Sequence, residues 1–141
     1  MTPPKSPIPV MEAATSRSTT PRDAWPSRIV VIIGLLTIAL IHLLDLPDKI
    51  EETPYLGVAF IALIIGSLVL AGVLSVQDNR TALLAAGGLA AAVIVGYAIS
   101  RTTGMPGAMD DVGNWLEPLG LASLFVEGTV VVFALPALRE A

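Results

Sequence analysis

The sequence predicts an all-α protein, a four-helix transmembrane bundle with a disordered N-terminal tail. Hydrophobic residues make up 54% of the chain and charged residues only 14%, whereas a soluble domain carries about 25% charged residues. The charges concentrate between four long apolar runs. Each run is close to the roughly 20 residues that a helix needs to cross the hydrocarbon core of a bilayer.

Residues 1–27 differ in composition from the rest of the chain. Prolines lie there among serines, threonines and scattered charges, with few apolar residues. Such a segment buries too little apolar surface to offset the entropy lost on ordering, which predicts a disordered tail on the cytoplasmic side. Because the tail is too long for the charged start of a signal peptide, we expect the first apolar run to remain as a membrane anchor.

Residues 28–141 are predicted to form the transmembrane domain, with helices at about 28–44, 55–76, 81–99 and 115–138. The first run is the shortest, the second has no charge, the third is rich in alanine and glycine, and the fourth contains an isolated glutamate at its middle. Their β-branched residues do not indicate strands, because an isolated strand cannot satisfy its backbone hydrogen bonds in lipid and a helix can.

Local signals support these boundaries. Thr53 followed by Pro54 is typical of an N-cap with proline at the first helical position. Asn114 with Glu117 three residues later resembles a capping box that opens the fourth helix. Residues 77–80 form a short polar connection, which predicts a tight antiparallel hairpin of the second and third helices.

Lysine and arginine predict the orientation, because they are enriched in cytoplasmic segments. With the N-terminus inside, the cytoplasmic basic residues are Lys5, Arg17, Arg22, Arg28, Arg80 and Arg139. The opposite side carries Lys49 and Arg101. We therefore expect a multi-pass protein of the plasma membrane with both termini in the cytoplasm.

The same topology predicts an acidic outer side. Its acidic residues are Asp45, Asp48, Glu51, Glu52, Asp110, Asp111 and Glu117. Acidic residues are tolerated wherever positive charge is excluded, and they also attract cations or a basic partner. The sequence leaves both interpretations open.

Glu127 lies near the middle of the fourth run. An ionisable side chain at that depth costs about 2.5–3.5 kcal/mol on insertion scales, so it is expected to lie against protein. Ser67 and Thr37 are hydrogen-bonding side chains at a similar depth, which gives a candidate intramembrane polar site of Glu127, Ser67 and Thr37. A protonated Glu127 can donate to a hydroxyl or a carbonyl of a neighbouring helix. Helix association, proton or ion handling, and contact with another subunit stay open as roles.

A second candidate site lies at the outer interface. Asp45 follows His42 by three residues, on approximately the same helix face. Arg101 and Glu117 are expected at the same level, facing each other at the ends of adjacent helices. The candidate outer-interface cluster is therefore His42, Asp45, Arg101 and Glu117. One histidine and two loop methionines are weak support for a transition metal, and we predict neither a metal nor another cofactor.

Gly88, Ala92 and Gly96 recur every four residues in the third run. Small residues at this spacing let helix backbones approach closely in a membrane. We expect the row to pack against neighbouring helices or across a homodimer, and the third helix to be central in the bundle.

Enzyme chemistry is not predicted. The chain has no cysteine and one histidine, which excludes thiol nucleophiles and disulfides. No phosphate-binding glycine loop and no Ser/His/Asp set can be identified. A net charge of −4 argues against nucleic acid as a partner. The expected partners are the lipid bilayer and a homo-oligomer or another membrane subunit.

The C-terminal segments 100–107, 113–120 and 123–127 contain the motifs SRTTGMPG, GNWLEPLG and SLFVE. They resemble the C-terminal hairpin of uncharacterised small four-helix integral membrane proteins of bacteria, actinobacteria in particular. The resemblance covers roughly the last forty residues and implies no activity. It implies that one site contains Arg101, Trp115, Glu117, Pro118 and Glu127.

The function predicted from these observations is that of a non-enzymatic multi-pass integral membrane protein, an accessory or structural subunit of a membrane assembly. The alternative is a small proton or cation channel or transporter that uses Glu127 as a midplane carboxyl.

Overall fold

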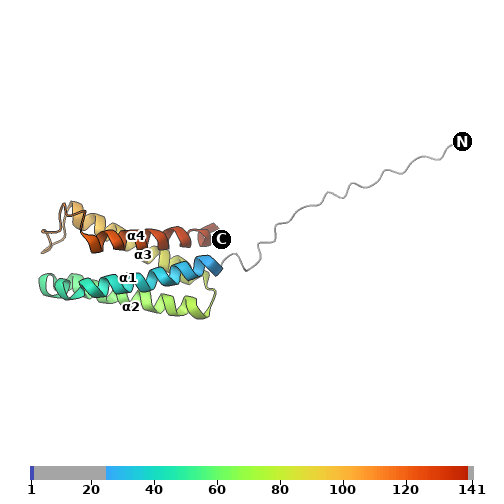
Figure 1. Ribbon diagram of the computed structural model, residues 1–141, viewed down its shortest axis with the longest axis horizontal. Coiled ribbons are helices and arrows are strands. Elements are labelled where there is room, and N and C mark those ends of the chain that lie inside the picture. Colours follow the sequence, from blue (N-terminus) through green and yellow to red (C-terminus); the bar gives the residue numbers. More distant parts are fainter. Residues whose placement is uncertain (2–24, 140–141) are drawn as a thin grey trace.

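The computed structural model describes Met1 and residues 25–139. Four long helices run side by side (Figure 1). The helices are α1 (Trp25–Glu52), α2 (Pro54–Val76), α3 (Arg80–Thr102) and α4 (Pro118–Ala134), followed by the short α5 (Pro136–Arg139). Residues 25–139 contain no β-strand, and four helical segments are long and apolar enough to cross a membrane. The predicted four-helix all-α fold is confirmed, and most of the predicted tail lies outside the described residues.

The bundle has two ends that differ in their connections (Figure 1). We call the end that carries Thr53 and residues 103–117 the distal end. The end that carries residues 77–79 and α5 is the proximal end. Both the start of α1 and the end of α4 lie at the proximal end, as four antiparallel helices require.

Helix α1 is longer than predicted in both directions. It begins at Trp25 and continues past Pro47 to Glu52, for 28 residues, whereas the sequence predicts an end near residue 44. Pro47 removes its own N–H from the helical hydrogen bonds but does not end the helix. At 1.5 Å per residue α1 is about 42 Å long. It therefore exceeds the ~30 Å apolar layer, so it either tilts or extends beyond that layer.

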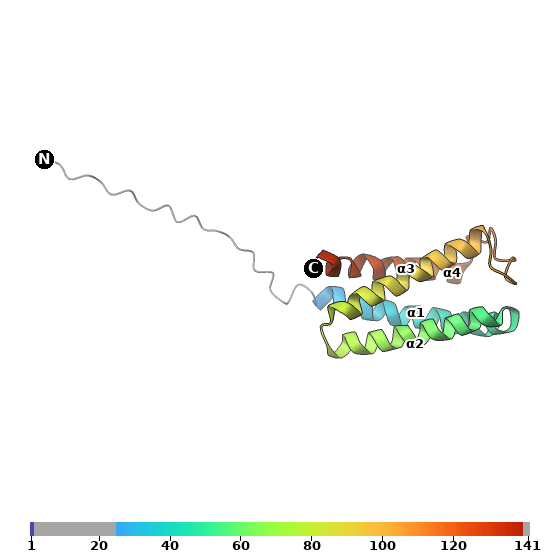
Figure 2. The ribbon, with the colours of Figure 1, turned by 180° about the vertical axis from the view of Figure 1, so that it is seen from behind.

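The short connections follow the predicted chemistry only in part. Thr53 occupies the N-cap position of α2 with Pro54 after it, but its side chain makes no capping bond. The Thr53 hydroxyl instead donates to the carbonyl of Gly107, 3.3 Å away. At the proximal end Asn79 caps α3, because its side-chain oxygen accepts from the N–H of Ala82 at 3.0 Å. The predicted hairpin of α2 and α3 forms there, but α3 diverges from α2 towards the distal end (Figure 2).

Helix α1, and not the predicted third helix, is central. It packs along α2 on one side and along α4 on the other. Its fully buried side chains are Val31, Leu35 and Ile38. They join a core whose other members are Leu63, Ala71, Leu74, Ala82, Ala86, Ala90 and Val130. The sequence does not distinguish α1 from α3 as the centre because both are apolar around much of their circumference.

The predicted packing row of α3 is also corrected. A Cβ atom added at Gly88 or Gly96 would meet nothing within 4 Å, and Ala92 is exposed. Among the described residues, the row therefore makes no close helix contact. The buried row of α3 consists of Ala82, Ala86 and Ala90. Both rows repeat every four residues, so the spacing alone cannot identify the buried one. Packing of the first row across a homodimer stays a prediction.

The fourth predicted helix differs at both ends. Helix α4 begins at Pro118, and its N-cap is Glu117, so the predicted capping box with Asn114 is wrong. Leu135 separates α4 from α5, because Pro136 has no N–H with which to continue the helical hydrogen bonds. The Nε of Arg80 donates to the Ala137 carbonyl at 2.7 Å, which ties α5 to the start of α3.

Candidate functional site

A cavity of about 490 Å³ lies between α1, α2, α3 and α4 and extends from the distal end towards the middle of the bundle. Its size falls within the range of roughly 300–1,000 Å³ that is usual for small-molecule sites. The deeper wall is apolar and includes Leu63, Leu89 and Val93. Met105 and Asp111 also line it, so the loop of residues 103–117 contributes to the distal wall.

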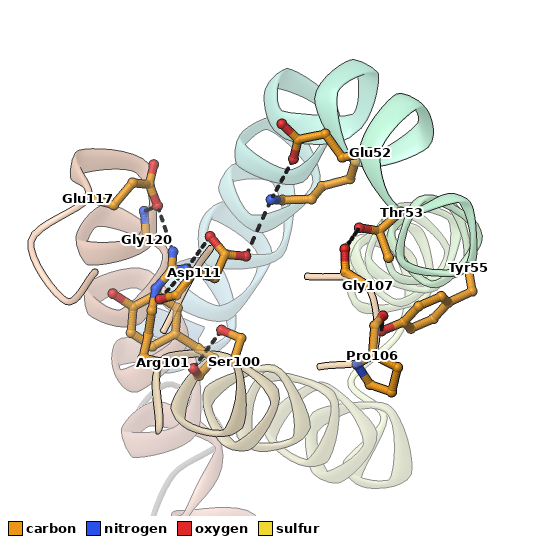
Figure 3. Close-up of polar contacts among 12 residues, drawn as sticks. Glu52, Thr53, Tyr55, Ser100, Arg101, Pro106, Gly107, Asp111, Glu117 and Gly120 are labelled. Atoms are coloured by element: carbon orange, nitrogen blue, oxygen red, sulfur yellow. Dashed lines mark hydrogen bonds and ion pairs between the residues drawn. The ribbon is translucent and has the colours of Figure 1, made fainter. Parts of the chain in front are cut away.

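Arg101 organises the distal end of the cavity (Figure 3). Its side chain is buried, with the residue 6% exposed. The guanidinium forms two ion pairs, with Nη1 2.5 Å from Asp111 Oδ1 and Nη2 3.2 Å from Glu117 Oε2. Its Cζ lies 4.8 Å from the centre of the Tyr97 ring, within cation–π range. A buried guanidinium is tolerated here because two carboxylates and an aromatic face replace its hydration.

The Glu117 carboxylate takes part in both a helix cap and an ion pair. Its carboxylate accepts from the N–H of Leu119 at 3.1 Å and from that of Gly120 at 2.9 Å, which caps α4. The same carboxylate accepts a hydrogen bond from Nη2 of Arg101, as predicted for these facing helix ends. The ion pair therefore fixes where α4 begins relative to the end of α3.

Asp111 and Lys49 belong to the same network, although they are not among the site residues predicted from the sequence. The Nζ of Lys49 lies 3.4 Å from Asp111 Oδ2 and 3.7 Å from Glu52 Oε2. Asp111 thus joins α1 to the end of α3 through Lys49 and Arg101 (Figure 3). Asp111 lies in an irregular loop, where no helical or strand period predicts which way a side chain points.

The loop is fixed on its other side as well. The Tyr55 hydroxyl donates to the Pro106 carbonyl at 2.8 Å, and Thr53 donates to Gly107 (Figure 3). Gly104 adopts a φ of 77°, in the left-handed region that favours glycine. The loop is therefore tied both to α3 and to the start of α2.

His42 and Asp45 line the same cavity from α1. The Nδ1–H of His42 donates to the Ile38 carbonyl at 2.9 Å. The ring packs edge-to-face on Phe60, with centres 4.8 Å apart. Asp45 has no ion pair within 4.0 Å among the described residues. All four residues of the predicted outer-interface cluster thus line one cavity, but only Arg101 and Glu117 bond to each other directly.

The predicted intramembrane site does not assemble as a cluster. Thr37 donates to the Ile33 carbonyl of its own helix at 2.8 Å. Ser67 is buried in α2, and within residues 25–139 its hydroxyl has no hydrogen-bond partner. Glu127 is on α4, which lies on the other side of α1 from α2 (Figure 1). Similar depth in the sequence does not place side chains on facing sides of neighbouring helices.

Glu127 is fully buried and is bonded within its own helix. Its Oε1 accepts from the Ser123 hydroxyl at 2.5 Å, and Oε2 has no partner among the described residues. The sequence allows a bond from Glu127 to a neighbouring helix, but the bond present among the described residues is to Ser123 of the same helix. Glu127 does not line the cavity, whereas Ser123 does. The cavity therefore reaches the hydrogen-bond partner of Glu127 and stops short of the carboxyl itself.

Binding is the chemistry that this arrangement supports. Apolar walls lie beneath a rim of acceptor and donor groups, as in sites that orient a small molecule by a few polar contacts. Among the described residues, no three His, Asp or Glu side chains are grouped to hold a metal ion.

Comparison of the chain with protein-family models, with curated proteins and with solved structures finds no match. The resemblance of the C-terminal hairpin to uncharacterised bacterial membrane proteins stays a prediction.

Proposed function

We propose that the chain is a non-enzymatic multi-pass protein of the plasma membrane that acts as an accessory or structural subunit of a membrane assembly. The observation that carries this proposal is the burial of Glu127. The carboxyl is 0% exposed and is bonded to Ser123 of its own helix. A carboxyl that takes up and releases protons or cations must exchange with water during each cycle. Glu127 is withdrawn from the cavity, which favours a packing role.

Two substitutions at Glu127 test this role. Glu127→Gln keeps the length of the side chain and an acceptor for Ser123, so we expect the unfolding free energy to fall by less than about 1 kcal/mol. Glu127→Asp retracts the carboxyl by one methylene group and leaves a void, so we expect a loss of about 1–2 kcal/mol. Thermal unfolding of the full chain in nanodiscs measures both. An Asp variant that is more stable than the Gln variant contradicts the packing role.

The alternative is a small proton or cation channel or transporter, and one contact favours it. Ser123 lines the cavity and also donates to Glu127, so a hydroxyl connects the cavity to the midplane carboxyl. Proteoliposomes that contain a pH-sensitive dye measure proton entry under an imposed potential. Flux by the wild-type protein that Glu127→Gln abolishes supports transport. Equal flux in both proteins and in empty liposomes supports the structural role.

A further inference from the structure

The wall of the cavity has an unbalanced negative charge. Lys49 and Arg101 are its cationic side chains, and Asp45, Asp111 and Glu117 are its carboxylates. Arg101 is bonded to Asp111 and Glu117, and Lys49 is held by Asp111 and by Glu52 outside the cavity.

Asp45 carries the remaining negative charge. Lys49 follows it by one helical turn, but the ammonium is held by Asp111 at 3.4 Å. Among the described residues no cation lies within 4.0 Å of the Asp45 carboxylate. A carboxylate that lines a cavity without an ion pair favours a cationic ligand.

His42 adds a second acceptor beside Asp45. Because its Nδ1–H donates to the Ile38 carbonyl, Nε2 of the neutral ring is an acceptor. No hydrogen bond to Nε2 is present in the described part of the chain. The imidazole and the carboxylate are three residues apart on α1, and both line the cavity. A ligand group held between two acceptors must itself carry N–H or O–H donors.

The deeper wall requires an apolar body. Leu63, Leu89 and Val93 line it, and Phe60 contributes an aromatic ring. Ala92 and Gly96 of α3 also line the cavity, and a Cβ at Gly96 would meet nothing within 4 Å. This part of the small-residue row therefore leaves space for a ligand.

We propose that the cavity binds an amphiphilic organic monocation, a protonated amine with an apolar body. The ammonium lies at Asp45 and His42, and the body occupies the space lined by Leu63, Val93 and Gly96. The apolar wall provides no ligand for a hydrated metal ion. An anionic headgroup would meet Lys49 and Arg101 with their carboxylate partners already in place. This binding is independent of the role of Glu127.

Direct binding to the full-length protein in nanodiscs tests the proposal. The probe is 1-naphthylmethylamine, which is cationic at neutral pH. Its matched probes are 1-naphthalenemethanol, which is neutral, and 1-naphthoate, which is anionic. Binding is read from naphthalene fluorescence polarisation after subtraction of empty nanodiscs. We expect the amine to bind about tenfold or more tightly than the alcohol, because only the amine forms a charge-assisted hydrogen bond.

Two pairs of variants assign the site. Asp45→Asn should weaken amine binding about tenfold and leave alcohol binding unchanged. Asp48→Asn is its control, because Asp48 is exposed on the same helix and does not line the cavity. Gly96→Leu should weaken binding of the amine and the alcohol alike by narrowing the apolar part of the cavity. Gly88→Leu is its control, because a side chain there also meets open space but lies outside the cavity.

Three results overturn the proposal. Equal binding of amine and alcohol with no effect of Asp45→Asn means that the cavity accepts any apolar molecule, such as a lipid chain. Preferred binding of 1-naphthoate means an anion site at Arg101 or Lys49. Full binding by Gly96→Leu, with wild-type thermal stability, means that the probe binds outside the cavity.

Discussion

Arg101 and Glu117 each carry several contacts with a single side chain. Glu117 caps α4 and receives Arg101, while Arg101 also holds Asp111 and lies over Tyr97. The Nε of Arg101 is buried without a partner among the described residues. Asp111 and Glu117 are the two carboxylates that pair with this guanidinium. Replacing the arginine would leave these two negative charges close together without their shared cation.

Replacing Arg101 should destabilise the protein more than any exposed substitution in the same turn. We expect Arg101→Gln to lower the unfolding free energy by about 2–3 kcal/mol, because a half-buried Asp111 and Glu117 lose their shared cation. Thermal unfolding in nanodiscs measures the change, with the exposed Thr102→Ala as a control. Adding Asp111→Asn should recover part of the loss. No recovery would show that Arg101 stabilises by packing on Tyr97 instead.

At the residue scale, the sequence predicts pairs that stand at helix ends better than pairs that involve loops. The Arg101–Glu117 contact could be predicted because Arg101 lies in the last turn of α3 and Glu117 at the start of α4, and both helix ends lie at the same end of the bundle. Asp111 was missed because its direction depends on how residues 103–117 turn. Asn114 was predicted to be the N-cap of the fourth helix, but that position belongs to Glu117. Both residue types can cap a helix, and which of them does so depends on tertiary contacts such as the one between Arg101 and Glu117.

At the scale of elements, hydrophobicity predicts which segments are helical but not how the helices pack. All four apolar runs are helices, because a run of that length has no other way to satisfy its backbone in lipid. The C-terminal end of α1 lies beyond the predicted one, and the added turns include Lys49, which bonds to Asp111 of a distant loop. The close approach of α1 and α4 depends on Gly34, a position the small-residue pattern did not select.

Gly34 should tolerate a side chain far less well than a glycine on the lipid side. A Cβ at Gly34 would collide with the Val130 side chain of α4, whereas one at Gly72 would meet nothing within 4 Å. We expect Gly34→Leu to cost about 1–3 kcal/mol through overpacking. Gly72→Leu should be neutral or stabilising, because leucine favours the helix by nearly 1 kcal/mol over glycine. Thermal unfolding of the two variants compares them, and equal effects would contradict the described packing of α1 on α4.

At the scale of the whole molecule, the cavity could not be predicted from the sequence. It exists because α3 leaves α2 after their connection and packs along α4 (Figure 2). The angle between two apolar helices depends on the sum of many small contacts, and no single residue in the sequence signals it. Four residues of the cavity's distal wall, His42, Asp45, Arg101 and Glu117, were nevertheless predicted, because polar side chains at the ends of apolar runs are few. The separation of charge between the two ends follows directly from the sequence.

That separation predicts the orientation of the bundle. Arg28, Arg80 and Arg139 lie at the proximal end, and Lys49 and Arg101 lie at the distal end. Translocation favours the side with fewer basic residues, so we expect the distal end outside the cell. The absence of cysteine in the chain makes single-cysteine labelling direct.

Thr103→Cys reports the distal end and Gln77→Cys the proximal end, since both residues are exposed. In intact cells a membrane-impermeant maleimide should label Thr103→Cys and should label Gln77→Cys only after permeabilisation. The reverse pattern would place the distal end, from which the cavity extends, in the cytoplasm, and any amine ligand would then have to come from inside the cell. Labelling of both variants in intact cells would mean that the chain inserts in two orientations, in which case the charge difference between its ends does not fix its topology.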